Sequence, residues 1–145
     1  MIASNNICVI GAGYWGKNHI KTLNSLGLLG GIVEENDSKR IDFEKIYKNV
    51  KTYNNVEDSL INNNFSGYTI ATPAETHYEI AKLIIKSKKH VMVEKPMTLT
   101  IDHAKSLVRL AKNNSVNLMV GHLLLFHPAI VKIKKLIKDG AIGDL

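Results

Sequence analysis

The chain has 145 residues, of which 45% are hydrophobic and 22% charged, and this size and composition are ordinary for a single globular domain with a hydrophobic core. It contains no apolar run near the roughly 20 residues that a membrane-spanning helix needs, and residues 1–6 lack a signal-peptide pattern, so we expect a cytoplasmic protein without a membrane partner. The net charge of +6 does not indicate nucleic acid, because the 19 basic residues are spread along the chain without an arginine-rich block or interleaved aromatic residues.

Short apolar runs alternate with longer segments of helical period along the whole chain. This alternation is typical of parallel strands joined by crossover helices, so we predict an α/β fold. Strands are expected near residues 7–10, 31–34, 51–53, 68–71, 90–93 and 117–120. Helices are expected near residues 14–27, 37–48, 56–62 and 74–86, after Thr100 and after Pro128.

Individual residues support the ends and faces of these helices. Gly27 suits the left-handed end of the first helix, and Thr100 can cap the fifth. The fifth helix has apolar residues at the i, i+3, i+4, i+7 spacing, namely Ala104, Leu107, Val108 and Ala111. The sixth is expected to bury Ile130, Ile133 and Ile137.

No disulfide or metal site is predicted. The single cysteine, Cys8, lies in the apolar run of the first strand, so a buried reduced thiol is expected. The six histidines and the carboxylates show no metal-ligand spacing such as H-x-x-x-H on one helix.

A glycine-rich loop follows the first predicted strand. Residues Gly11-Ala12-Gly13-Tyr14-Trp15-Gly16 have the pattern G-x-G-x-x-G where a strand leads into a helix. Gly11 permits the tight turn, Gly13 lets backbone N–H groups approach a pyrophosphate, and Gly16 lets the helix pack close to the strand. The helix N-terminus adds partial positive charge, so the loop predicts a dinucleotide site, the alternative being a βα turn without a ligand. Tyr14 and Trp15 either pack on this loop or cover the cofactor.

An acidic pair ends the second predicted strand, about two dozen residues after Gly11, where a carboxylate is expected to bind the ribose hydroxyls of adenosine. We select Glu35 as this cofactor ligand, with Glu34 and Asp37 as alternatives. A carboxylate there would repel a 2′-phosphate, which favours NAD over NADP, whereas Lys39 and Arg40 favour the opposite.

Three further segments carry a family resemblance. They are "ATPAETHYEIA" (residues 71–81), "KKHVMVEKPMTLT" (residues 88–100) and "VGHLLLFHPAI" (residues 120–130). With the glycine loop, they resemble the Gfo/Idh/MocA family of NAD(P)-dependent oxidoreductases over nearly the whole chain. The resemblance implies an NAD(P)-binding Rossmann domain over residues 1–145, with a doubly wound parallel sheet and helices on both faces.

The resemblance also implies a C-terminal domain that supplies most of the substrate site and the oligomer interface. We expect this domain to be absent from the chain, so that the chain alone binds cofactor weakly and catalyses little. Leu123, Leu124, Leu125 and the last helix would then be uncovered, and the chain would self-associate as a homo-oligomer.

The segments "GHLLLFHP" and "GYWGKNH" are most similar to family members that oxidise carbon 3 of a UDP-linked N-acetylhexosamine or its uronic acid. They imply a sugar or nucleotide-sugar substrate and hydride transfer to NAD. The chain departs from the family pattern at Lys88, where many members have Gly, and at Glu35, where Asp is commoner.

Lys95 follows the fifth predicted strand and is the candidate catalytic residue. A lysine at the end of a buried strand is costly to desolvate, so it either reaches solvent or is held at a site. Oxidation of a secondary alcohol needs a group that takes or relays the hydroxyl proton. The resemblance implies that Lys95, partly desolvated beside the nicotinamide, has this role, and that Pro96 fixes the turn that directs it.

Other candidates are expected around the same site. Thr72 and Pro73 would pass over the nicotinamide or its ribose, and Glu94 would contact the nicotinamide side of the cofactor or stabilise its loop. His77 is close to the site by resemblance, although its residue type suits helix capping or packing equally well.

Two histidines are candidates for the substrate side. His122 and His127 follow the last strand, at the edge of the sheet where ligands bind, and His127 has a structural role as its alternative.

Two other function classes remain open. A stand-alone NAD(H)-binding regulatory module would bind nucleotide without needing Lys95. A methyltransferase-like domain would bind S-adenosylmethionine, although the glycine pattern together with "EKP" argues against it.

Overall fold

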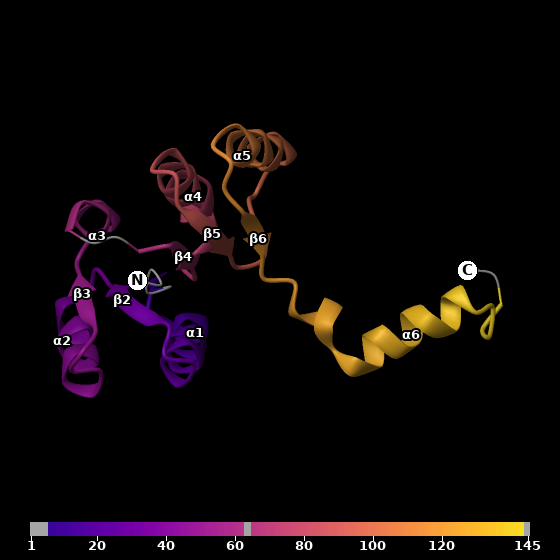
Figure 1. Ribbon diagram of the computed structural model, residues 1–145, viewed down its shortest axis with the longest axis horizontal. Coiled ribbons are helices and arrows are strands. Elements are labelled where there is room, and N and C mark those ends of the chain that lie inside the picture. The colour runs from indigo at the N-terminus through magenta and orange to yellow at the C-terminus, as the bar shows by residue number, and fades with distance from the viewer. Residues whose placement is uncertain (1–5, 63–64, 144–145) are drawn as a thin grey trace, which may run out of the picture.

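The computed structural model describes residues 6–62 and 65–143, which form one parallel sheet with helices on both of its faces (Figure 1). The strands are β1 (Ile7–Ile10), β2 (Leu29–Val33), β3 (Lys51–Tyr53), β4 (Gly67–Ile70), β5 (His90–Val93) and β6 (Leu118–Val120). The helices are α1 (Tyr14–Ser25), α2 (Asp37–Ile46), α3 (Val56–Asn62), α4 (His77–Lys86), α5 (Ile101–Asn113) and α6 (Pro128–Lys138), with short 3₁₀ turns η1 (Ala74–Thr76) and η2 (Leu123–Phe126).

The strand order is β3-β2-β1-β4-β5-β6, and every neighbouring pair is parallel. The chain builds outward from β1 to β3, returns to place β4 on the other side of β1, and then builds outward to β6. The order therefore reverses between β1 and β4, which is where open α/β sheets bind ligands at the carboxyl ends of their strands. The predicted doubly wound Rossmann-type fold is confirmed.

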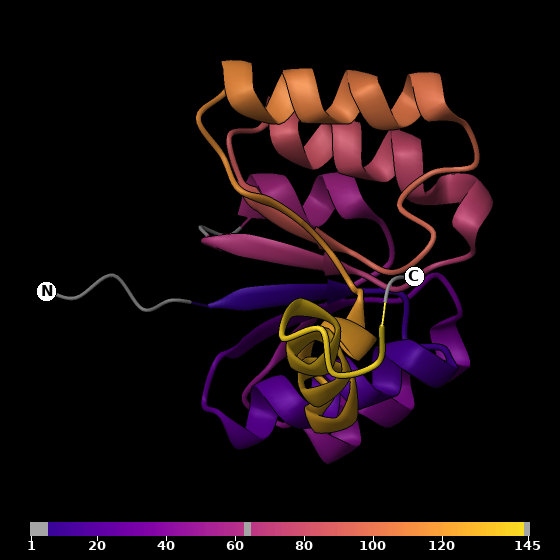
Figure 2. The ribbon, with the colours of Figure 1, turned by 90° about the vertical axis from the view of Figure 1, so that its right-hand side faces the viewer.

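The helices form a layer on each face of the sheet (Figure 2). Helices α1 and α2 cover one face, and α3, α4 and α5 cover the other (Figures 1 and 2). Strand β1 serves both cores because its side chains alternate: Val9 packs with Ile20 and Phe43, whereas Cys8 and Ile10 pack on the opposite side. Because both faces are covered, the central strands have almost continuous apolar sequences.

Cys8 is fully buried in this core, as its position in an apolar strand predicts. Burial raises the pKa of the Cys8 thiol well above its usual range. The thiol is therefore kept in its unreactive protonated form.

Helix α5 has the predicted cap but a narrower buried face than its sequence indicates. Oγ1 of Thr100 accepts a hydrogen bond from the backbone N–H of His103 at 3.2 Å, so the expected cap is confirmed. Leu107 and Ala111 are buried, whereas Val108 is exposed. Helix α5 lies at the β6 edge and packs mainly on α4, so only part of its apolar stripe has a partner.

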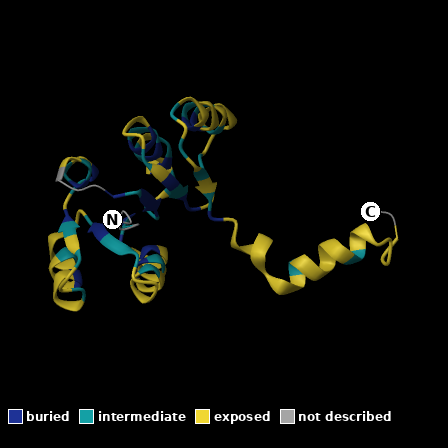
Figure 3. Cartoon of the chain, viewed as in Figure 1, coloured by how far each residue is buried: buried dark blue, intermediate teal, exposed yellow. Residues whose placement is uncertain are grey.

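The predicted burial of Ile130, Ile133 and Ile137 in α6 is wrong. Helix α6 contains no buried residue; it extends away from the sheet, and its surface is exposed along most of its length (Figure 3). The physical reason is topological, because β6 is an edge strand and the chain leaves the sheet there without returning over either face. The expected exposure of Leu123, Leu124 and Leu125 is confirmed.

Within the part of the chain that the structure describes, no helix is both long enough and apolar enough to cross a bilayer.

Candidate functional site

Two glycines of the loop are required by the protein's own geometry. Gly11 has φ +86°, and a Cβ added there would lie 2.9 Å from the carbonyl oxygen of Ala71. A Cβ at Gly16 would lie 1.8 Å from the carbonyl oxygen of Gly11. The close approach at Gly16 is therefore made mainly to the start of the loop, rather than to the strand as expected.

Gly13 is different, because nothing in the described chain requires a glycine there. Its φ is −70°, which any residue adopts, and an added Cβ would meet no atom within 4 Å. A ligand bound in this open space would leave no room for a side chain, which would explain the glycine. Gly13 is the N-cap residue of α1, which begins at Tyr14, and it provides no side-chain cap, so the first N–H groups of the helix are available to an anion.

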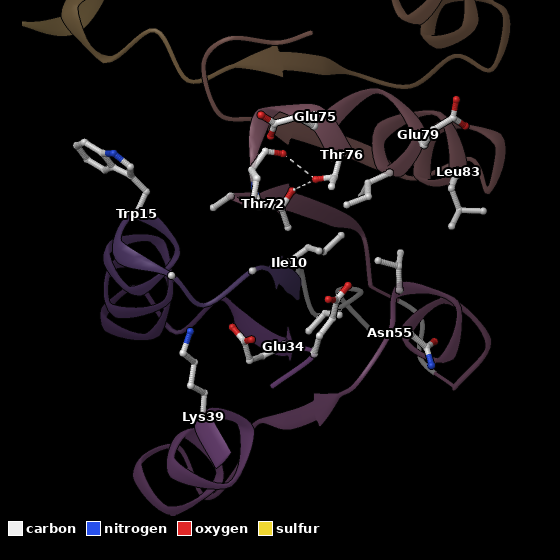
Figure 4. A pocket seen from close by; sticks show the side chains of 18 of the residues that line it. Ile10, Trp15, Glu34, Lys39, Asn55, Thr72, Glu75, Thr76, Glu79 and Leu83 are labelled. Atoms are coloured by element: carbon white, nitrogen blue, oxygen red, sulfur yellow. Dashed lines mark hydrogen bonds between the residues drawn. The ribbon is translucent and has the colours of Figure 1, made fainter. Parts of the chain in front are cut away.

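A cavity of about 1120 Å³ opens beside this loop, at the carboxyl ends of β1, β2 and β4 (Figure 4). Pockets for drug-sized ligands have volumes of roughly 300–1,000 Å³, so this one is large enough for a dinucleotide. The predicted cofactor residues that line it are Gly11, Gly13, Tyr14, Trp15, Glu35, Thr72 and Pro73. The apolar side chains of Val56, Ile80 and Leu83 also line the cavity and suit a planar ring such as adenine.

The carboxylate nearest to the glycine loop belongs to Glu34. Strand β2 ends at Val33, one residue earlier than predicted, so Glu34 is the first residue beyond it. Its Oε2 accepts a hydrogen bond from the N–H of Ala12 at 3.0 Å, and its Oε1 accepts one from the N–H of Asn36 at 3.1 Å. Glu35 is exposed and also lines the cavity. The geometry therefore favours Glu34 over Glu35 as the ribose ligand.

These residues fit a dinucleotide. The uncapped end of α1 can hold a pyrophosphate, and a carboxylate at the end of β2 can accept hydrogen bonds from ribose hydroxyls. The apolar side chains that line the cavity can contact the base. The side chains of Lys39 and Glu34 lie on the same side of the cavity (Figure 4).

The Thr72-Pro73 turn is braced from two directions. Oγ1 of Thr76 donates to the carbonyl of Pro73 at 2.8 Å and lies 2.7 Å from Oγ1 of Thr72 (Figure 4). His77 is 1% exposed, and its Nε2 lies 2.9 Å from the carbonyl oxygen of Thr72. Its Nδ1 lies 2.8 Å from the carbonyl oxygen of Pro96, so His77 joins this turn to the Lys95–Pro96 turn. The geometry favours the packing alternative for His77 over cofactor contact.

Glu94 is also buried, and Lys95 is not. Oε1 of Glu94 lies 2.7 Å from Nε2 of His19, and its Oε2 accepts a hydrogen bond from the N–H of Lys95 at 3.2 Å. Lys95 is exposed, and its ammonium group has no partner among residues 6–62 and 65–143. The partial desolvation expected of Lys95 is therefore not supplied by the described residues.

His19 is not among the site residues predicted from the sequence, although it is the last residue of the segment "GYWGKNH". It lies three residues after Gly16, nearly one helical turn further along α1.

The two histidines proposed for the substrate side lie away from the cavity. His122 is exposed at the start of η2 and makes no side-chain cap bond. Nδ1 of His127 accepts a hydrogen bond from the N–H of Ala129 at 3.2 Å, so it caps α6 as its structural alternative predicts. Across the described residues, no group of histidine, cysteine and carboxylate side chains is arranged to hold a metal ion.

Comparisons with known proteins identify the family and the fold. The model of the Gfo/Idh/MocA oxidoreductase family, described by its NAD-binding Rossmann fold, matches residues 5–122. The chain is 27% identical over 127 residues to UDP-N-acetylglucosamine 3-dehydrogenase of Acidithiobacillus ferrooxidans, covering 88% of this chain and 40% of that protein. It is 29% identical over 143 residues to 2,7-anhydro-N-acetylneuraminate hydratase of Escherichia coli, covering 97% and 37%.

A solved structure shows the same fold. GenD2 from gentamicin A biosynthesis, crystallised with NAD, superposes with a TM-score of 0.89 at 26% identity, over 97% of this chain and 41% of that one. The chain thus spans about 40% of the length of the relatives that it matches. Since the family model covers most of the chain, the chain belongs to the Gfo/Idh/MocA family of oxidoreductases and has that family's NAD-binding Rossmann fold.

Proposed function

We propose that this chain is the cofactor-binding part of a dehydrogenase that oxidises a secondary hydroxyl of a sugar. The observation that carries the proposal is the open space at Gly13, beside an uncapped helix end and a carboxylate fixed to the same loop. Each of these features suits one part of NAD, and together they line a cavity of sufficient size.

The chain's own residues have separate tasks in this proposal. Backbone N–H groups at the start of α1 hold the pyrophosphate, and Glu34 accepts hydrogen bonds from the adenosine ribose while disfavouring a 2′-phosphate. NAD supplies the hydride acceptor. Lys95, at the carboxyl end of β5, takes or relays the proton of the substrate hydroxyl. Its exposed ammonium is free to face a substrate.

The proposed substrate is a UDP-linked N-acetylhexosamine or its uronic acid. Support comes from the segments "GYWGKNH" and "GHLLLFHP" and from the relative that is a UDP-N-acetylglucosamine 3-dehydrogenase. A relative at similar identity is a hydratase that acts on an anhydro sugar acid, so the products of any turnover should be identified rather than inferred from NADH formation alone.

Cofactor binding is the first test. The single tryptophan, Trp15, lines the cavity, so its fluorescence should change when NAD⁺, NADH or NADPH is titrated into the chain. We expect saturable binding, with NADH bound more tightly than NADPH. No binding at millimolar cofactor would contradict the proposal.

Catalysis is tested in a full-length relative, by replacing the lysine that matches Lys95 with Met. Turnover of the nucleotide sugar should fall by at least about a hundredfold, because a positioned acid or base contributes roughly 10²–10⁴ to the rate. The affinity for NAD should be unchanged. Unaltered turnover would exclude the role of Lys95 as the proton acceptor.

A further inference from the structure

A partly buried hydrogen bond between His19 and Glu94 lies beside the loop that carries Lys95. Glu94 is 5% exposed, and its Oε1 lies 2.7 Å from Nε2 of His19. Its other carboxylate oxygen accepts the hydrogen bond from the backbone N–H of Lys95. The two oxygens thus join helix α1 to the residue that we propose as the proton acceptor.

Glu94 has little freedom to change these contacts. Its backbone N–H donates to the carbonyl of Ile70 at 3.0 Å, and a Cβ added at Gly121 would lie 3.1 Å from its Oε2. Among the described residues, the imidazole of His19 is the side chain that donates to Glu94, at 2.7 Å. A buried carboxylate that lost this donor would be left incompletely hydrogen-bonded, which is unfavourable. The place of Glu94 therefore depends on His19.

The pair connects two parts of the cofactor site. His19 lies on α1, the same helix whose N-terminus faces the cavity, and Glu94 directly precedes Lys95. Neither His19 nor Glu94 is among the described residues that line the cavity. The contact with Glu94 therefore gives His19 a route to the Lys95 loop that is separate from the route along α1 to the glycine loop.

We infer that His19 is a positioning residue for Lys95 and acts through the carboxylate of Glu94; this inference rests on the proposed function. The imidazole N–H fixes Glu94, and Glu94 fixes the backbone N–H of Lys95. This arrangement holds the lysine loop against the nicotinamide end of bound NAD. Loss of His19 should then weaken contact with the nicotinamide half and leave the ADP-ribose half unaffected.

A matched pair of substitutions isolates the imidazole N–H. His19→Gln keeps a terminal amide N–H close to the place of Nε2, whereas the shorter side chain of His19→Asn cannot reach Glu94. Both variants remain polar at a partly exposed position of α1, so they differ mainly in this one hydrogen bond.

The experiment compares the wild-type chain with both variants. Exchange of the Lys95 amide proton is followed by NMR, and dissociation constants are measured for NADH and for ADP-ribose. For His19→Asn we expect about tenfold faster exchange at Lys95 and about tenfold weaker NADH binding, with ADP-ribose affinity within about twofold of wild type. His19→Gln should restore both values.

Two results would overturn the inference. One is a Lys95 exchange rate and an NADH affinity in His19→Asn equal to those of the wild type. The other is an equal loss of affinity for NADH and ADP-ribose, which would indicate a general effect on the fold. Failure of the proposed function differs from both, because the wild-type chain would then bind neither nucleotide, while the exchange measurement would still test the hold of His19 on Lys95.

Discussion

The carboxylate of Glu34 accepts a hydrogen bond from the backbone of the glycine loop, and Glu34 also lines the cavity. Its two oxygens accept N–H groups from Ala12 and Asn36, so the side chain has a fixed direction before any ligand is present. Glu35 is exposed and has no comparable anchor within the described ranges, 6–62 and 65–143. A carboxylate that is already oriented loses less conformational entropy when it binds a ribose, which is why we favour Glu34.

Paired substitutions test this choice. Glu34→Gln should weaken NADH binding by about tenfold or more, because hydrogen bonds to a charged group contribute roughly 1.5–3 kcal/mol. It should also reduce the preference for NADH over NADPH, since the charge that repels a 2′-phosphate is removed. Glu35→Gln is the control and should change both affinities by less than about twofold; calorimetric titration measures them. A larger loss in Glu35→Gln would restore the choice made from sequence.

Contacts between residues far apart in the chain could not be predicted from the sequence. Residue types and local spacing were sufficient to select the glycine loop, the acidic pair and the Thr72-Pro73 turn, which all line the cavity. His19 and Glu94 are 75 positions apart, and no local pattern encodes a contact over that distance. His77 was selected, but its two contacts with backbone carbonyls depend on the tertiary placement of two turns.

At the scale of elements, the glycine-rich segment between the end of β1 and the first turn of α1 contains glycines with different requirements. Gly16 is held against the carbonyl of Gly11, so the fold itself excludes a side chain there. Gly13 faces open space with an ordinary φ, so only a ligand would exclude one. The two positions therefore separate stability from binding within a single loop.

We expect Gly16→Ala to reduce mainly the stability of the chain and Gly13→Ala to reduce mainly its affinity for NADH. Gly16→Ala should lower the free energy of unfolding by about 1–3 kcal/mol, the usual cost of overpacking, as measured by urea denaturation. Gly13→Ala should change it by less than about 1 kcal/mol but weaken NADH binding by about tenfold or more, because its methyl group would occupy the space of the pyrophosphate. Unchanged NADH affinity in a folded Gly13→Ala variant would contradict the assignment of this space.

How well the surroundings of a helix or strand could be predicted depends on what that element packs against. The bounds of β1, β3 and β5 match their predictions because apolar runs bounded by turn residues specify buried strands. Helix α6 has the same kind of apolar periodicity as α5, but no sheet face lies beneath it. Periodicity shows that a helix has an apolar face, not what covers that face.

At the scale of the whole molecule, the chain has two unlike regions. The sheet and its two helical layers contain the buried apolar core, whereas η2 and α6 contain no buried residue (Figure 3). We call the second region the apolar arm and define it as residues 123–138. Its exposed apolar side chains include Leu124, at 68% exposure, and Phe126, at 69%. Many exposed apolar side chains on one segment favour association.

We therefore expect the chain to self-associate through the apolar arm. Analytical ultracentrifugation should show a sedimentation coefficient that rises with protein concentration. Salt should strengthen the association, because α6 also carries lysines that repel one another when two copies meet, namely Lys132, Lys134, Lys135 and Lys138. The paired substitution Leu124→Glu with Phe126→Glu should raise the dissociation constant by about tenfold or more, since it removes apolar area and adds charge.

Ile61→Glu is the matched control, because Ile61 is also strongly exposed but lies on α3, at the opposite side of the sheet from the apolar arm (Figure 1). It should leave association unchanged, because an isolated exposed residue offers too little area for a stable contact. If Ile61→Glu weakened association as much as the paired substitution, the contact would not be specific to the arm. A wild-type chain that sediments as a monomer at every concentration and salt would show that the lysines of α6 outweigh its apolar face.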